Sequence, residues 1–148
     1  MLRPSRKTLF AIEAVLDIAY NAGDEPVQSR DITARQGIPR RYLEQVLQQL
    51  VRADILSGVR GPRGGYRLAR ERRRISIGDI VRLVDPPAAE AAEAGGSPLG
   101  VRVVQPLWRG LEAEFMTRLD QITIQDLCGE ARSQGLQAQG ERRLDYSI

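Results

Sequence analysis

Apolar and polar positions alternate with helical periodicity over much of the chain, beginning with residues 5–22. The apolar side chains of that segment leave only Glu13, Asp17 and Asn21 as a polar stripe, at spacing i, i+4 and i+8. A helix with so narrow a polar face is buried on most sides, so we interpret it as a scaffold for the next elements of the chain. The turn-forming residues 23–26 then end it.

The next two periodic segments predict a helix over residues 29–36 and a second helix over residues 40–53. Gly37 lies where a left-handed residue closes a helix, and Pro39 sets the backbone for the first turn of the next one. Two helices joined by such a short turn form a helix-turn-helix, although ordinary helical hairpins have the same pattern. The second helix has an apolar packing stripe of Leu43, Val46, Leu47 and Leu50.

The opposite face of this second helix carries side chains that can read base edges in the major groove of DNA. Arginine pairs with guanine, glutamine pairs with adenine, and a carboxylate accepts from the amino group of cytosine. An ordinary solvated helix face is the alternative interpretation. The candidate DNA-contacting residues of this helix are Arg40, Arg41, Tyr42, Glu44, Gln45 and Gln48.

A β-hairpin is predicted next, with one strand at residues 55–59 and its return at residues 66–68. Its tip combines arginine with glycine and proline, which bend the chain and let the backbone approach a surface. Arginine at such a tip can bind phosphates or enter a narrow minor groove, which a purely structural hairpin does not require. Lys7 is a further candidate phosphate contact. The candidate residues of the hairpin are Arg60, Gly61, Arg63, Gly64, Gly65 and Tyr66.

A fourth helix is predicted over residues 77–84, where Ser76 and Asp79 form a capping box. These elements together predict a winged helix-turn-helix domain over residues 1–85, and a fold that is mainly α with a small β-hairpin. Residues 86–106 are rich in alanine, glycine and proline, and are predicted to form a linker or sensor loop.

The rest of the chain is predicted to form dimerisation helices over residues 107–133 and a flexible tail over residues 134–148. An apolar seam runs along the first of these helices, and it is longer than a small winged domain needs. A symmetric partner is the simplest explanation, and packing against the chain's own first helix is the alternative. The residues of this seam are Trp108, Leu111, Phe115, Leu119 and Ile122.

The distribution of charge favours a polyanionic partner for the first half of the chain. The net charge is only +3, but residues 1–85 hold 16 basic and 10 acidic residues, whereas residues 86–148 hold 6 and 9. Seven arginines fall within residues 60–74. For residues 70–74 a solvated charged face is the alternative to DNA binding.

Composition excludes several other classes of protein. No apolar run approaches the roughly 20 residues that cross a bilayer, so we expect no membrane partner. The lone Cys128 cannot form an internal disulfide, which indicates a cytoplasmic location. We do not expect an enzyme, because the chain has no histidine, no phosphate-binding GxxxxGK motif and no metal-spaced cysteines. A winged-helix adaptor that binds another protein is the alternative function.

Several short runs together resemble the Rrf-two family of bacterial transcription regulators, and especially its iron–sulfur cluster-binding members. The most specific are Tyr-Leu-Glu-Gln at residues 42–45 and Val-Arg-Gly-Pro-Arg-Gly-Gly-Tyr at residues 59–66, within a likeness that covers about residues 1–132. The resemblance implies a homodimeric, sequence-specific transcription regulator. It would bind partly palindromic operators in double-stranded DNA, most simply as a repressor, through two protomers with crossing C-terminal helices.

One departure from the family concerns sensing. Cluster-binding members carry three cysteines and often a histidine in the segment equivalent to residues 86–107, where this chain has neither. Because thiolates hold iron–sulfur clusters, we expect no metal site and no iron–sulfur cofactor, and an unidentified effector at residues 86–106. Cys128 is a small buried side chain, a thiol that pairs with its copy across a dimer, a ligand to a cluster shared between two chains, or an oxidation sensor.

Overall fold

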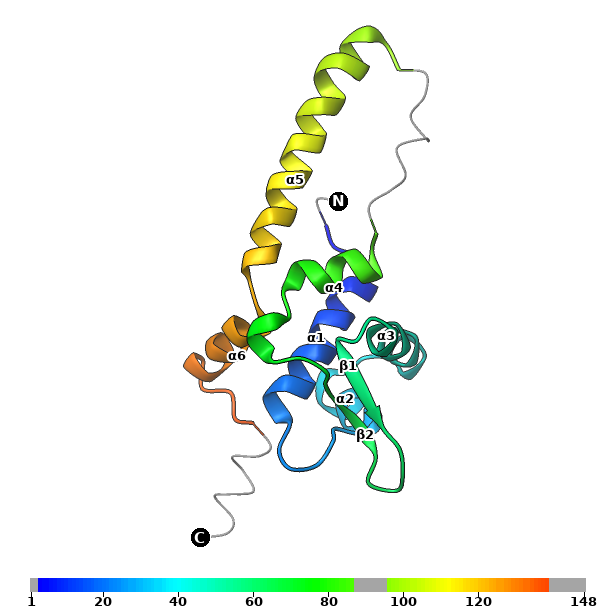
Figure 1. Ribbon diagram of the computed structural model, residues 1–148, viewed down its shortest axis with the longest axis vertical. Helices are drawn as coiled ribbons and strands as arrows, with labels where there is room; N and C mark the ends of the chain where they lie inside the picture. The colour runs from blue at the N-terminus through cyan, green and yellow to red at the C-terminus, as the bar shows by residue number, and fades with distance from the viewer. Residues whose placement is uncertain (1–2, 87–95, 139–148) are drawn as a thin grey trace.

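The computed structural model describes residues 3–86 and 96–138 (Figure 1). The predicted fold class, mainly α with a small β-hairpin, is confirmed. The elements are α1 (Arg6–Asn21), α2 (Ser29–Gln36), α3 (Arg40–Arg52), β1 (Leu56–Val59), β2 (Gly65–Leu68), the 3-10 turn η1 (Arg72–Arg74), α4 (Ile77–Val84), the π-helical turn η3 (Gly100–Val104), α5 (Gln105–Gln121) and α6 (Ile124–Ser133). Within these residues, no helix is both long and apolar enough to cross a membrane.

α1 is the central element of the molecule. It begins where the Ser5 hydroxyl accepts a hydrogen bond from the amide of Thr8 at 3.1 Å. Figure 1 shows α3 on one side of α1 and α6 on the other. The core packs around Ala11, Val15 and Ile18, which are completely buried. The winged unit and the last helix therefore share one hydrophobic core through α1.

Asp17 does not belong to an exposed polar stripe, contrary to the sequence expectation, because it is only 2% exposed. Arg35 of α2 donates to both of its carboxylate oxygens, at 2.8 and 2.9 Å, and Gln36 donates at 2.8 Å. The hydrogen bond to Asp17 also raises the pKa of the Arg35 guanidinium. A buried charge with three such partners is compensated for its lost hydration, and the cluster joins α2 to α1.

The wing is a hairpin with a third short segment beside it. β1 and β2 pair antiparallel, with Leu56 opposite Leu68 and Val59 opposite Gly65. Val27, in the loop between α1 and α2, then pairs with Tyr66 of β2, and their amides and carbonyls exchange hydrogen bonds of 3.0 and 2.8 Å. The sequence predicted only a chain break before α2. This bridge fixes the position of the wing relative to the helix-turn-helix.

α4 and α5 meet at Gly78, where a side chain does not fit. A Cβ atom on Gly78 would collide with the carboxylate of Asp120. The same carboxylate accepts from Arg82 at 2.7 Å, a pairing that lowers the pKa of Asp120. The amide of Ile77 also donates to the carbonyl of Ile122 at 2.8 Å. The base of α5 is therefore held against the winged unit by both backbone and side chains.

The prediction of a linker over residues 86–106 is wrong for its second part, because a helix begins at residue 98. The hydroxyl of Ser97 accepts from the amide of Gly100 at 3.1 Å, and η3 continues directly into α5. The glycine-rich composition obscured this start. Residues 87–95 lie outside the described part of the chain.

Residues 134–138 are the described part of the predicted tail, and they return toward α1. The hydroxyl of Tyr20 donates to the carbonyl of Leu136, and Ala138 is only 7% exposed. The expected flexible tail therefore starts with an ordered turn, in which Gly135 adopts a φ of +78°. Residues 139–148 lie outside the described residues.

Candidate nucleic-acid interface

α3 presents its polar face to solvent and its apolar face to the core. Its four apolar stripe residues are at most 1% exposed, which anchors the helix. All six side chains that the sequence proposed for this face are exposed. They are Arg40, Arg41, Tyr42, Glu44, Gln45 and Gln48.

Two contacts order side chains on this face. The Nε of Arg40 donates to the carboxylate of Glu44, one helical turn further on, at 3.1 Å. Both side chains are mostly exposed, so this pair is weak in water and can exchange for a base edge or a phosphate. The ring of Tyr42 lies tilted against Phe10 of α1, with 6.1 Å between ring centroids. That contact joins α3 to the start of α1, where the half-buried Lys7 lies.

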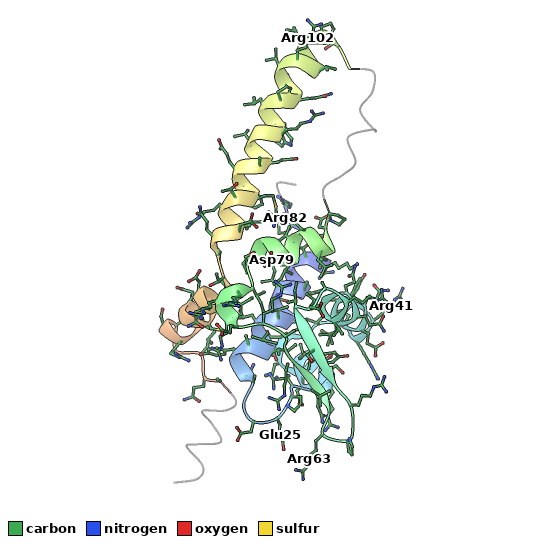
Figure 2. All side chains as sticks on the ribbon, viewed as in Figure 1. Glu25, Arg41, Arg63, Asp79, Arg82 and Arg102 are labelled. Atoms are coloured by element: carbon green, nitrogen blue, oxygen red, sulfur yellow. The ribbon has the colours of Figure 1, made fainter. Side chains whose placement is uncertain are left out.

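The two arginines at the wing tip, Arg60 and Arg63, are both exposed. Figure 2 places Arg63 at the far end of the wing, and Arg41 projects from α3 away from the body of the molecule. Arg63 lies 3.8 Å from the carboxylate of Glu25, but both side chains are mostly exposed. Such a pair costs little to break when a phosphate approaches.

The predicted wing residues other than the arginines shape the hairpin. Gly61 has a φ of +111° with open space around it, which suits the tip of a turn. A Cβ atom on Gly64 would lie 2.8 Å from the carbonyl oxygen of Gly61, and one on Gly65 would lie 2.7 Å from the carbonyl carbon of Val27. Tyr66 is half-buried against the core. The sequence did not separate these roles from DNA contact.

Gly65→Ala is expected to lower the free energy of unfolding by about 2 kcal/mol, because the added methyl group forces the Val27 bridge apart. Gly58→Ala is the matched control in the same hairpin, since a Cβ atom there meets nothing within 4 Å. Urea denaturation measures both variants. Equal losses of stability would show that the close approach of residues 27 and 65 is unimportant.

The arginines that follow β2 do not form one uniform solvated face. Arg70 donates to the carbonyls of Ala53 and Asp54 at 3.2 and 3.1 Å, and so joins the end of the wing to the end of α3. Arg73 pairs with Glu71 at 2.6 Å, which lowers the pKa of Glu71. This part of the charged run therefore has structural roles that the sequence did not reveal.

The apolar seam of α5 divides into two parts. Leu119 and Ile122 are half-buried against the core of their own chain, where α5 packs chiefly on α4. Trp108, Leu111 and Phe115 remain 46%, 48% and 51% exposed. Further apolar side chains are exposed between these residues and the far end of the helix. They are Leu99, Val101, Val103, Val104 and Leu107.

Cys128 of α6 is buried, with 2% of its surface exposed. Burial raises the pKa of its thiol, so the sulfur is protonated at neutral pH. A buried protonated thiol behaves as a small apolar side chain. This placement favours the interpretation of Cys128 as a small buried side chain.

The chain is similar to curated and solved regulators over most of its length. It is 37% identical over 129 residues to the HTH-type transcriptional regulator IscR of Vibrio cholerae, covering 85% of this chain and 75% of the relative. Among solved structures, IscR of T. potens has 33% identity and a TM-score of 0.72, with 87% of this chain and 88% of that one covered. CymR, the global cysteine regulator of B. subtilis, has 27% identity and a TM-score of 0.74, covering 88% and 98%.

The family model that matches residues 4–130 carries the description "Iron-dependent Transcriptional regulator". The donors of this chain do not fit an iron–sulfur cluster held by one protomer, because the sequence has one cysteine and no histidine. Among residues 3–86 and 96–138, no three acidic or cysteine side chains come together in a group that could hold a metal ion. The single thiol, that of Cys128, is buried in the core.

The matched residues include the helix-turn-helix, the wing, α4, α5 and most of α6. The curated relative and the structural neighbours are named as regulators, and the first is of the HTH type. The exposed face of α3 beside a basic wing agrees with that match. The chain belongs to the Rrf-two (Rrf2) family, and it is a DNA-binding transcription regulator rather than an enzyme.

Proposed function

We propose that the protein is a homodimeric repressor that recognises a partly palindromic operator through two copies of its winged helix. The observation that carries this proposal is the exposed polar face of α3 next to a wing with two exposed arginines at its tip. A sequence-specific regulator needs both features, because phosphate contacts supply affinity and base contacts supply specificity.

The side chains of α3 suit the major groove. Arg40 and Arg41 are the candidates for guanine, Gln45 for adenine, and Glu44 for the amino group of cytosine. The pairing of Arg40 with Glu44 supports this assignment, since it holds the two groups side by side before DNA arrives. The exposed wing arginines suit the adjacent minor groove or its phosphates.

The exposed part of the α5 seam supports a dimer. Three half-exposed large apolar residues on one helix are costly in water, and a two-fold contact would cover each seam with its copy. Two winged helices held in this way would address half-sites about 34 Å apart, one turn of B-form DNA, or a multiple of that distance.

We further propose that this regulator works without an iron–sulfur cluster, because its one cysteine is buried and protonated. Protein purified without oxygen is expected to show no visible absorbance bands, and to bind its operator equally well before and after treatment with an iron chelator. Cluster-type absorbance that disappears on chelation, together with operator binding, would refute the proposal.

Arg60→Ala is expected to weaken binding to the operator and to reduce the slope of log affinity against log salt by about 1, because one phosphate contact is lost. The operator is the duplex that the wild-type protein selects from a random pool. Arg102→Ala, in η3 at the far end of the molecule, is the control of equal charge and should change neither quantity (Figure 2). An adaptor that only binds other proteins would enrich no sequence in the selection at physiological salt.

A further inference from the structure

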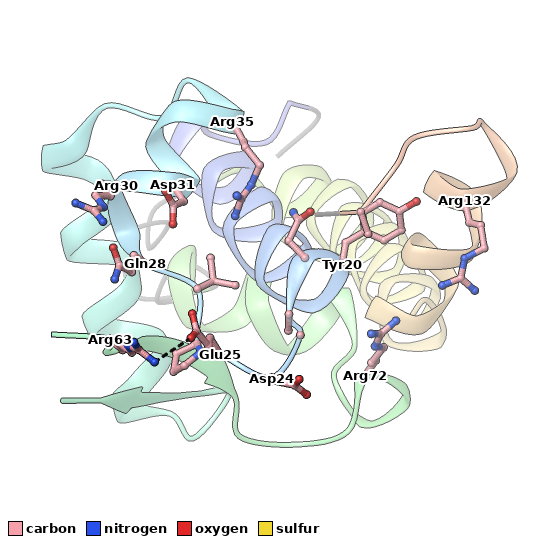
Figure 3. Close-up of a pocket in the computed structure, with 16 residues that line it drawn as sticks. Tyr20, Asp24, Glu25, Gln28, Arg30, Asp31, Arg35, Arg63, Arg72 and Arg132 are labelled. Atoms are coloured by element: carbon pink, nitrogen blue, oxygen red, sulfur yellow. Dashed lines mark ion pairs between the residues drawn. The ribbon is translucent and has the colours of Figure 1, made fainter. Parts of the chain in front are cut away.

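A pocket of about 890 Å³ opens between the end of α1, the loop after it, α2, η1 and α6 (Figure 3). It also reaches Arg63 of the wing, but its lining among the described residues includes no part of α3. The pocket is therefore separate from the helix face that reads DNA. Its position next to the Val27 bridge connects it with the wing.

Positive charge gathers at the end of the pocket between η1 and α6. Figure 3 shows the guanidinium groups of Arg72 and Arg132 pointing toward one another beside Tyr20. Within residues 3–86 and 96–138, no carboxylate forms an ion pair with either group. Both also act on the buried Cys128 thiol and oppose the effect of burial on its pKa, so the two charges converge on one place.

The other end of the pocket is close to neutral. Arg63 pairs there with Glu25 at 3.8 Å, and Arg35 is neutralised by Asp17. Arg30 and Asp31 of α2 and Asp24 of the loop also line the pocket. The arginine end therefore offers two positive charges that no carboxylate of the described residues neutralises in an ion pair. A dianion carries the charge that matches these two groups.

DNA binding does not explain the two arginines. α6, which carries Arg132, lies on the opposite side of α1 from α3 (Figure 1). Two like charges brought together on separate elements repel each other, and an anion between them would remove the repulsion. Arginine also binds phosphate oxygens through two parallel hydrogen bonds, which makes phosphate the group that best suits this pair.

We propose that this pocket binds a small phosphate-bearing dianion between Arg72 and Arg132, and that the ligand is an effector of the regulator. The effector part rests on the proposed function. The ligand would join η1 to α6 beside the turn where Tyr20 donates to Leu136, and would contact the loop that pairs with the wing. The segment first expected to sense an effector is instead helical over residues 98–106.

The direct test is calorimetric titration of the full chain with inorganic phosphate and, separately, with glycerol 3-phosphate, at constant ionic strength. We expect saturable binding that Arg72→Gln and Arg132→Gln each weaken about tenfold or more, since each removes charge-assisted hydrogen bonds. Arg102→Gln, at the far end of the molecule, should bind as the wild type does (Figure 2). Binding of both probes would identify free phosphate as sufficient, whereas binding of the ester alone would identify a phosphorylated metabolite.

Two results would overturn the site: no saturable binding of either probe, or binding that both pocket variants retain. Circular dichroism checks that each variant is folded. Arg132 is exposed on α6, so its replacement should leave the fold intact. The effector role is tested by operator affinity with and without saturating ligand, since coupling between two sites is reciprocal. Unchanged operator affinity would overturn that role alone. Ligand binding by a protein that selects no duplex would instead refute the proposed function.

Discussion

Phe115→Glu is expected to convert the proposed dimer into a monomer, and to weaken operator binding by about two orders of magnitude. Phe115 is 51% exposed in the part of the α5 seam that its own chain does not cover. In a two-fold contact the substitution would bury a carboxylate twice without partners, which costs far more than the lost ring. Each winged helix would then bind its half-site alone. Sedimentation velocity and mobility shift measure the two effects.

The control for this experiment is Leu136→Glu. Leu136 is an apolar residue with a comparable exposure of 60%, but it lies after α6 and outside the seam. Its substitution should leave both sedimentation and operator affinity unchanged. A wild-type protein that sediments as a monomer, or a Phe115→Glu variant that remains a dimer, would refute the role of the seam.

Asp17→Asn is expected to lower the free energy of unfolding by about 3 kcal/mol, because it leaves the Arg35 guanidinium without its counter-charge. The replacement has the same shape, so packing hardly changes. The side chain of Asp17 is completely buried and that of Arg35 is only 24% exposed, so water cannot replace the lost carboxylate fully. Urea denaturation at one protein concentration measures the loss.

Glu13→Gln on the same helix is the matched control for Asp17→Asn, since Glu13 is exposed and should contribute little. Arg35→Gln and the double variant complete a thermodynamic cycle that isolates the energy of the pair. A loss for Asp17→Asn no larger than that for Glu13→Gln would show that the buried ion pair does not hold α2 to α1.

The helices and turns that depend on neighbouring residues could be predicted from the sequence. Gly37 adopts the expected left-handed conformation, with a φ of +66°. Ser76 and Asp79 form the expected capping box, because both partners lie within one turn of the same helix. The exposed polar face of α3 follows from the apolar stripe on its other side.

Features that depend on distant residues could not be predicted. Asp17 matches an exposed stripe by periodicity, and only the fold brings Arg35, 18 residues further on, to its carboxylate. The pairing of Val27 with Tyr66 likewise joins residues from separate elements. The helix that begins at residue 98 was missed for a different reason, since glycine and proline dominate the composition around it.

The candidate site shows the same division. The sequence identified the arginines of the wing tip, but not that Gly64 and Gly65 are required by close backbone contacts. It also could not place Arg72 against Arg132, because these residues lie on different elements and neither is part of a motif. The run of arginines after the wing was the only signal, and it does not distinguish structural members from ligand-binding ones.

The contact of Asp120 with Gly78 fixes the angle at which α5 leaves α4, and any change of that angle is amplified along the helix. The helix has 17 residues and is about 25 Å long, so a tilt of about 5° at Gly78 would displace its far end by about 2 Å. A single methyl group at this position is enough to disturb the seat of Asp120. In the proposed dimer such a tilt would alter the separation of the two wings. The absence of a side chain at residue 78 would therefore determine the spacing of the two half-sites that the dimer can bind.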